Sequence, residues 1–210
     1  MHRKILPAAL AASSLLLASC ANVPLTETGF LGDYSDLKPA PEAEVWGIPD
    51  TVRLYRSPAL DQGAYDAVIV DASVWMPTDE HDHRPTDEKT AWLLEELSIC
   101  LAKGLAEDFE IITTPRPGAL RLRPAMTAVD PANVWINLVT LVLLVPVDMG
   151  GISGEFEVVD AMTGERVLAM DARREGNPFL FLEVFTTYGQ ARHGMWKWSR
   201  LLAEQLQPRD

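Results

Sequence analysis

Gly154-Glu-Phe-Glu-Val-Val-Asp160 and Arg166-Val-Leu-Ala-Met-Asp-Ala-Arg173 are separated by the five residues Ala161-Met-Thr-Gly-Glu165. Two strand-like stretches joined by a short loop that contains glycine predict a β-hairpin. Gly164 supplies the positive φ that such a turn often needs. The preceding run Gly150-Gly-Ile-Ser-Gly154 is interpreted as a flexible turn into this hairpin.

Further strands are predicted on the N-terminal side of the hairpin. Residues 65–75 are rich in β-branched side chains, and 109–114 form a second short candidate. Residues 119–129 alternate between apolar and polar side chains, which predicts a half-exposed strand that is antiparallel to a neighbour. These segments predict a sheet of about four to six strands of mixed direction.

Two segments have helical periodicity. The first begins after the capping candidate Thr86, carries an apolar stripe from Leu93 to Leu105, and has Gly104 near its expected end. The second runs from about Tyr188 to Leu206 and places Trp198 on its apolar face. The predicted fold class is therefore α/β: a two-layer α/β sandwich with two main helices on one face of the sheet.

The N-terminus has the order of features found in bacterial lipoprotein signals. A basic patch at residues 2–4 precedes an apolar run, which ends in Leu17-Ala-Ser-Cys20. The apolar run is too short for a stable membrane-spanning helix. We expect cleavage between Ser19 and Cys20 and lipidation of the Cys20 thiol, and two or three acyl chains would anchor the protein stably.

The signal divides the chain into three expected parts. They are the signal peptide at residues 1–19, the lipidated N-terminus and tether at 20–50, and a single domain at 51–210. Several prolines interrupt the tether, but its segment 29–37 is too apolar for a pure spacer. We expect four of its side chains to pack onto the domain: Phe30, Leu31, Tyr34 and Leu37.

Charge and cysteine content exclude some classes of function. The net charge is −12, which argues against nucleic acid as a partner and against electrostatic docking on anionic lipids. After lipidation of Cys20 only Cys100 remains, so no internal disulfide is possible, and Cys100 is expected to be a buried, unreactive thiol.

Residues 134–147 are almost continuously apolar. A buried core element is favoured over a membrane span at this length, and contact with an envelope protein partner or the membrane interface is the alternative.

The sequence offers few candidates for a chemical site, and we expect no cofactor. His81 and His83 are weak candidates for a metal site, but a third, distant ligand is missing and a solvated loop is favoured. Arg173-Arg174 could clamp a carboxylate or phosphate, although two arginines at a strand end are usually solvated. Trp196 and Trp198 lie about 200° apart on a helix and do not share a face.

Several motifs in this order resemble the bacterial lipoproteins catalogued as domain of unknown function 3313. They are the lipobox, Gly29-Phe30-Leu31-x-Asp33-Tyr34-Ser35-x-Leu37, Tyr65-Asp66-x-Val68, Glu155-x-Glu157-x-x-Asp160-x-x-Thr163-Gly164-Glu165 and the tryptophan-containing last helix. The resemblance spans about Thr28 to Leu206 and implies a small α/β domain on a lipid anchor. It implies no catalytic residues.

These features predict a lipid-anchored protein of the outer membrane whose domain faces the periplasm. The leading hypothesis is a non-enzymatic binding or assembly module. One alternative is an auxiliary lipoprotein of an envelope transport system that uses residues 134–147 as a contact surface. A metal-dependent hydrolase that uses His81 and His83 is the less favoured alternative.

Overall fold

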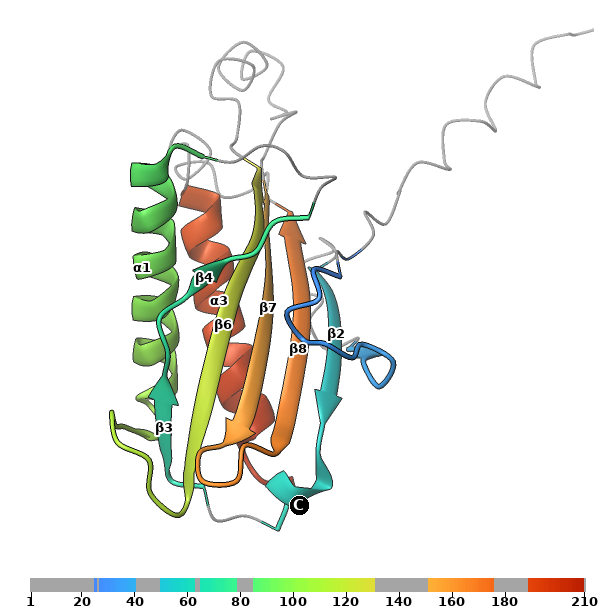
Figure 1. Ribbon diagram of the computed structural model, residues 1–210, viewed down its shortest axis with the longest axis vertical. Coiled ribbons are helices and arrows are strands. Elements are labelled where there is room, and N and C mark those ends of the chain that lie inside the picture. Colours follow the sequence, from blue (N-terminus) through green and yellow to red (C-terminus); the bar gives the residue numbers. More distant parts are fainter. Residues whose placement is uncertain are drawn as a thin grey trace, which may run out of the picture.

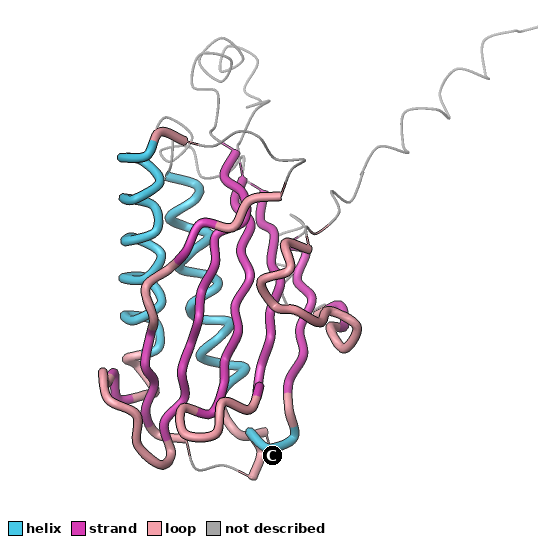
Figure 2. Tube along the Cα trace, viewed as in Figure 1, coloured by secondary structure: helices cyan, strands magenta, loops and turns pink. Residues whose placement is uncertain are grey.

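The computed structural model describes residues 25, 27–40, 50–62, 65–78, 85–130, 151–175 and 189–209. These residues form one mixed sheet of eight strands with two helices on one of its faces (Figures 1 and 2). The predicted α/β class and the two helices are confirmed. The predicted number of four to six strands is too low, because β1 and β2 at the N-terminal side were missed and residues 65–75 form two strands.

The centre of the sheet is an antiparallel meander. Strands β6 (Ala119–Asp130), β7 (Gly151–Asp160) and β8 (Arg166–Glu175) pair in sequence order, and Gly164 has φ +74° in the predicted turn between the last two. Asp160 stabilises this turn, because its Oδ1 accepts hydrogen bonds of 2.8 Å from the amides of Met162 and Thr163.

Shorter strands extend the sheet on both sides. Next to β8 lie β2 (Asp50–Arg56) and then β1 (Lys38–Pro39), both antiparallel. On the other side, β3 (Ala67–Val70) and β4 (Val74–Trp75) pair in parallel with successive parts of β6, and β5 (Glu110–Ile111) pairs with β3. A 3-10 turn, η2 (Pro58–Leu60), follows β2.

Two regions differ from the sequence-based prediction. Residues 151–154 are part of β7 and not a flexible turn, because their backbone pairs with β6 on one side and β8 on the other. In the second region, β6 is buried on both faces from Pro124 to Val129, so only its first half is the predicted half-exposed strand.

The helices α1 (Asp87–Leu105) and α3 (Gly189–Leu206) cover one face of the sheet and pack against each other. Thr86 occupies the expected N-cap position of α1 but its side chain makes no capping hydrogen bond. Trp198 is buried in the core, and its ring meets Phe156 of β7 edge-on at 5.4 Å. No helix among the described residues is long and apolar enough to span a membrane.

Gly104 lies near the end of α1, as expected, at a point where this helix packs closely against Ser199 of α3. A Cβ atom at this position would lie 2.3 Å from Ser199 Oγ and 2.6 Å from Ser199 Cβ. Gly104→Ala is therefore expected to lower the free energy of unfolding by about 1–3 kcal/mol, despite the better helix propensity of alanine. Urea denaturation measures this change.

The matched second substitution is Ser199→Gly, which removes the two nearest of the atoms that a Cβ at position 104 would meet and leaves the Ser199 backbone carbon at 3.3 Å. The double variant should regain most of the stability lost by Gly104→Ala, after allowing for the lower helix propensity of glycine. Additive losses in the double variant would contradict a steric cause.

Candidate functional site

The sites predicted from the sequence lie outside the described residues. This applies to Ser19 and Cys20, to His81 and His83, and to the apolar stretch 134–147. Within the described ranges no group of three or more His, Cys, Asp or Glu side chains is arranged to hold a metal ion. His193 on α3 is partly buried, and this burial lowers its pKa, as do the charges of Arg174 and Lys197.

Other sequence-based interpretations are resolved by the fold. Cys100 is buried at 1% exposure, which confirms its predicted burial, and this burial raises the pKa of its thiol to about 11, which disfavours the nucleophilic thiolate. The expectation of solvated arginines at the end of β8 is wrong, since Arg173 and Arg174 are both buried. Arg173 donates to Ser153 Oγ at 3.1 Å and to Asp130 Oδ2 at 3.0 Å, so it clamps a carboxylate of its own chain.

The face of the sheet opposite the helices carries two buried carboxylates. Glu155 of β7 and Asp171 of β8 are direct cross-strand partners, and their exposed fractions are 0% and 1%. Side chains directly opposite each other in an antiparallel pair have Cβ atoms about 5 Å apart, and like charges there destabilise. Burial of two carboxylates in this arrangement is therefore electrostatically costly.

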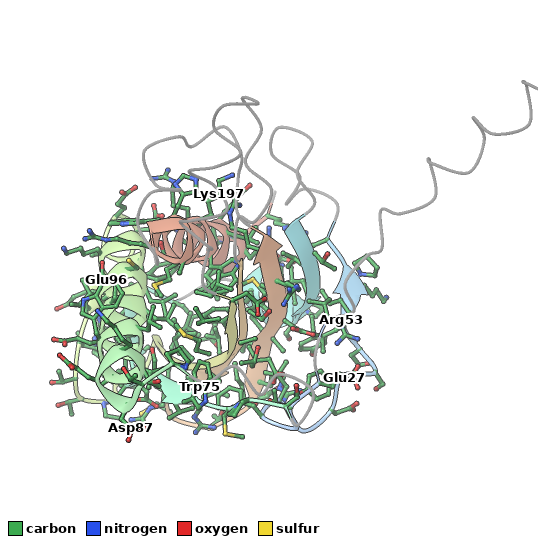
Figure 3. All side chains as sticks on the ribbon, turned by 90° about the horizontal axis from the view of Figure 1, so that it is seen from above. Glu27, Arg53, Trp75, Asp87, Glu96 and Lys197 are labelled. Atoms are coloured by element: carbon green, nitrogen blue, oxygen red, sulfur yellow. The ribbon has the colours of Figure 1, made fainter. Side chains whose placement is uncertain are left out.

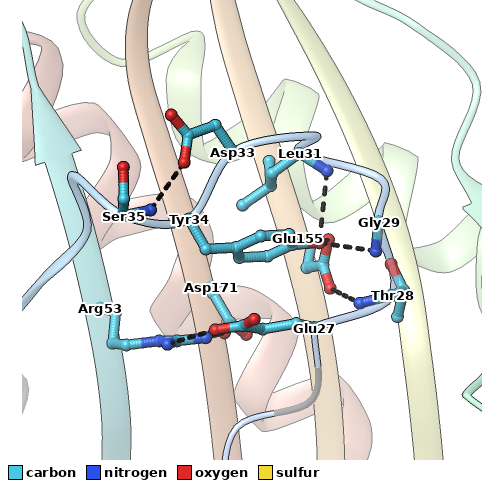
Figure 4. Close-up of polar contacts among 10 residues, drawn as sticks. All are labelled: Glu27, Thr28, Gly29, Leu31, Asp33, Tyr34, Ser35, Arg53, Glu155 and Asp171. Carbon is cyan, nitrogen blue, oxygen red and sulfur yellow. Dashed lines mark hydrogen bonds and ion pairs between the residues drawn. The ribbon is translucent and has the colours of Figure 1, made fainter.

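Residues 27–37, which we call the strap, cover this carboxylate pair (Figure 4). Figure 3, a view at right angles, shows Glu27 and Arg53 on the side of the sheet away from α3. The predicted packing of the 29–37 segment is confirmed: Leu31 and Leu37 are buried with Ala169 in a small apolar cluster, with Phe30 and Tyr34 against it. Thus part of the expected tether is attached to the domain.

Glu155 holds the strap through both of its oxygens. Oε2 accepts a hydrogen bond of 2.6 Å from the Tyr34 hydroxyl, and Oε1 accepts one of 3.0 Å from the backbone N–H of Thr28 (Figure 4). The Tyr34 oxygen also accepts from the backbone N–H of Gly29 at 2.9 Å. Burial, followed by the hydrogen bond to Glu155, raises the pKa of Tyr34 to about 12, so the phenol keeps its proton.

Arg53 of β2 links the other carboxylate to the strap. It donates to Asp171 Oδ2 at 2.6 Å and to Glu27 Oε1 at 2.8 Å, and its guanidinium lies 5.9 Å from the centre of the Tyr34 ring. Burial nevertheless raises the pKa of Asp171 to about 6, against the effect of Arg53 and with a further contribution from Glu155. Among the described residues Asp171 Oδ1 has no hydrogen-bond partner.

A second arginine fixes the strap from the hairpin. Arg166 donates to the backbone carbonyls of Leu31 and Asp33, and it pairs with Glu157 at 2.8 Å. The strap motif and the hairpin motif of the sequence thus meet in space. The arrangement recognises a chain segment through its backbone groups and one phenol, and the oxygens of Glu155 are already used for this purpose.

A family described as "Protein of unknown function (DUF3313)" matches residues 26–202, which include the strap and most of the domain. The chain belongs to this family. It is 25% identical over 177 residues to the uncharacterized lipoprotein YdcL of Escherichia coli K12, and the match covers 77% of this chain and 78% of YdcL. The same values apply to YdcL of E. coli O157:H7.

Solved structures of low sequence identity are also similar. A PelC dodecamer from Paraburkholderia phytofirmans matches with a TM-score of 0.48 and 14% identity, over 77% of this chain and all of that one. A single-residue variant of this PelC dodecamer, in another crystal form, matches over the same shares of the two chains with a TM-score of 0.44 and 16% identity.

Proposed function

We propose that this protein is a lipid-anchored component of the bacterial envelope that acts as a non-enzymatic binding or assembly module. The observation that carries the proposal is the position of the strap. Its first contact with the domain is made by Glu27, seven residues after Cys20, the expected site of lipidation. The description of the relative YdcL as a lipoprotein supports the same anchor.

The proposed location is the outer membrane, with the domain in the periplasm. Ala21 follows Cys20, and absence of Asp at this position favours sorting to the outer membrane in Gram-negative bacteria. The acidic composition suits a domain that remains in the aqueous phase beside the membrane. A partner, rather than a substrate, fits a face on which the buried Glu155 binds the chain's own strap.

Crosslinking in intact cells tests the proposed role. A photo-reactive residue in place of Trp92 or Ile99, two exposed apolar side chains of α1, should give a discrete crosslinked species. The same residue at Met162, in the exposed hairpin turn, samples a different part of the surface. Recovery of the protein without any crosslinked partner from all three positions would argue against a binding or assembly module.

A further inference from the structure

The strap is held separately from the main core. Leu31 and Leu37 form an apolar cluster with Ala169, whereas the large core lies on the other face of the sheet, between it and the helices. The strap itself has no strand pairing, and β1, which follows it, has only two residues. Local opening is easiest where a segment has few buried apolar contacts and few ladder hydrogen bonds.

The closed strap covers two carboxylates whose burial costs free energy. Glu155 and Asp171 lie opposite each other without access to water, and the strap is what covers them. Opening the strap would restore water to both carboxylates and would release the ordered backbone of residues 27–37. These two gains oppose the burial of Leu31 and Leu37 and the polar contacts that close the strap. Those contacts are the hydrogen bonds that Glu155 accepts from Tyr34 and Thr28, the bonds that Arg166 donates to two strap carbonyls, and the Arg53–Glu27 ion pair.

Opening of the strap would change the distance over which the domain can move from its lipid anchor. With the strap closed, the seven residues from Cys20 to Glu27 reach at most about 25 Å. With the strap open and β1 still paired, the eighteen residues from Cys20 to Lys38 reach about 60 Å. Opening would therefore more than double the distance that the domain can move from its anchor.

We propose that the strap is a releasable clasp that sets how far the domain stands from the membrane. The closed clasp holds the helix-free face of the sheet within the short reach of the lipid anchor. The open clasp lets the domain reach a partner further away and exposes Glu155, Asp171 and Arg53. This proposal rests on the lipid anchor of the proposed function.

Hydrogen exchange measured by mass spectrometry on the full lipidated chain tests whether the clasp opens. Amides of residues 28–37 should exchange at least about tenfold faster than those of β7 and β8, through local opening. Tyr34→Phe removes the hydroxyl that bonds Glu155 and should speed exchange in the strap by roughly a further 10- to 100-fold. Exchange in β7 and β8 should stay unchanged.

Tyr55→Phe is the matched control, because Tyr55 packs against the same apolar cluster and its hydroxyl has no hydrogen-bond partner among the described residues. It should leave exchange in the strap unchanged. The proposal would be overturned if the strap amides of the wild type exchanged as slowly as those of β7 and β8. It would also be overturned if Tyr34→Phe and Tyr55→Phe changed exchange in the strap equally.

Energy transfer tests the change in reach. The acceptor is a dye on the lipid headgroups of vesicles, and the donor is attached through Glu95→Cys on the exposed face of α1, since Cys100 is buried. Leu31→Asp combined with Tyr34→Phe should hold the clasp open and lower the transfer efficiency. The proposal of a releasable clasp would be overturned if the transfer efficiency stayed the same. It would also be overturned if the amides of β7 and β8 lost their protection from exchange in the double variant.

A fatty-acid label on Cys20 is measured in the same samples. If Cys20 carries no label, the proposed lipid anchor is wrong, and opening of the strap cannot change the distance between the domain and the membrane. With the label present, the exchange and energy-transfer results judge the clasp alone.

Discussion

Cys20→Ser is expected to abolish incorporation of a fatty-acid analogue into this protein in a Gram-negative host. The thiol of Cys20 is the nucleophile that accepts the diacylglyceryl group, and a serine hydroxyl at this position offers no equivalent nucleophile. Cleavage before residue 20 should fail as well, so the variant should run as the uncleaved precursor. Metabolic labelling followed by electrophoresis measures both changes.

Cys100→Ser is the control for this experiment. The Cys100 thiol is buried in α1 and its raised pKa keeps it protonated, so this variant should take up the label as the wild type does. Membrane fractionation alone does not decide the matter, because a retained signal peptide can itself hold the precursor at the inner membrane. A wild-type chain without label would contradict the lipoprotein interpretation.

The sequence predicted those elements whose pattern is local. The stripe from Leu93 to Leu105 and the face of Trp198 indicate helices, and α1 and α3 begin and end within one or two residues of the expected positions. The hairpin around Gly164 follows in the same way from turn chemistry. Packing of Leu31 and Leu37 was expected because apolar residues are unusual in a spacer.

The strand β2 was missed although a signal is present. Val52 and Leu54 alternate with Arg53 and Tyr55, which is the period of a half-buried strand. The stretch lies at the very start of the expected domain at 51–210, directly after the proline-interrupted tether, and no strand was assigned to it.

The carboxylate pair under the strap was missed for a physical reason. Glu155 and Glu157 have the alternation of a solvated strand face, and local pattern gives no sign that residues 27–37 will cover Glu155. Only the register of the hairpin, which places Glu155 opposite Asp171, could have paired the two residues before a structure was known. Burial of Arg173 also depends on tertiary contacts, which in its case are with Ser153 of β7 and Asp130 of β6.

The last prediction concerns the pH dependence that the buried Asp171 gives to stability. Its pKa is about 6 in the folded protein and 3.8 in the reference state, so the folded state binds this proton more tightly than the unfolded chain. The contribution of Asp171 to the free energy of unfolding therefore falls as pH rises from about 4 to about 6, by roughly 3 kcal/mol in total. Asp171→Asn should lack this contribution.

Arg53→Met should widen the pH range over which that stability is lost. Without the guanidinium at 2.6 Å, the pKa of Asp171 rises above 6, so the variant keeps losing stability at pH values where the wild type has reached its plateau. The deficit of Arg53→Met relative to the wild type should be smallest near pH 5 and should grow above pH 6 by up to about 1.4 kcal/mol per pH unit.

Urea denaturation between pH 5 and pH 8 measures these curves, with Asp171→Asn in both backgrounds as the control. The pKa of His193 is lowered, so its contribution has the opposite sign and is lost as pH falls, but it cancels when variants are compared at one pH. In the Asp171→Asn background, Arg53→Met should cause a deficit that does not vary with pH, from lost packing and the lost pair with Glu27. A pH-dependent deficit in that background would assign the effect to another carboxylate, of which Glu155 is the nearest in register.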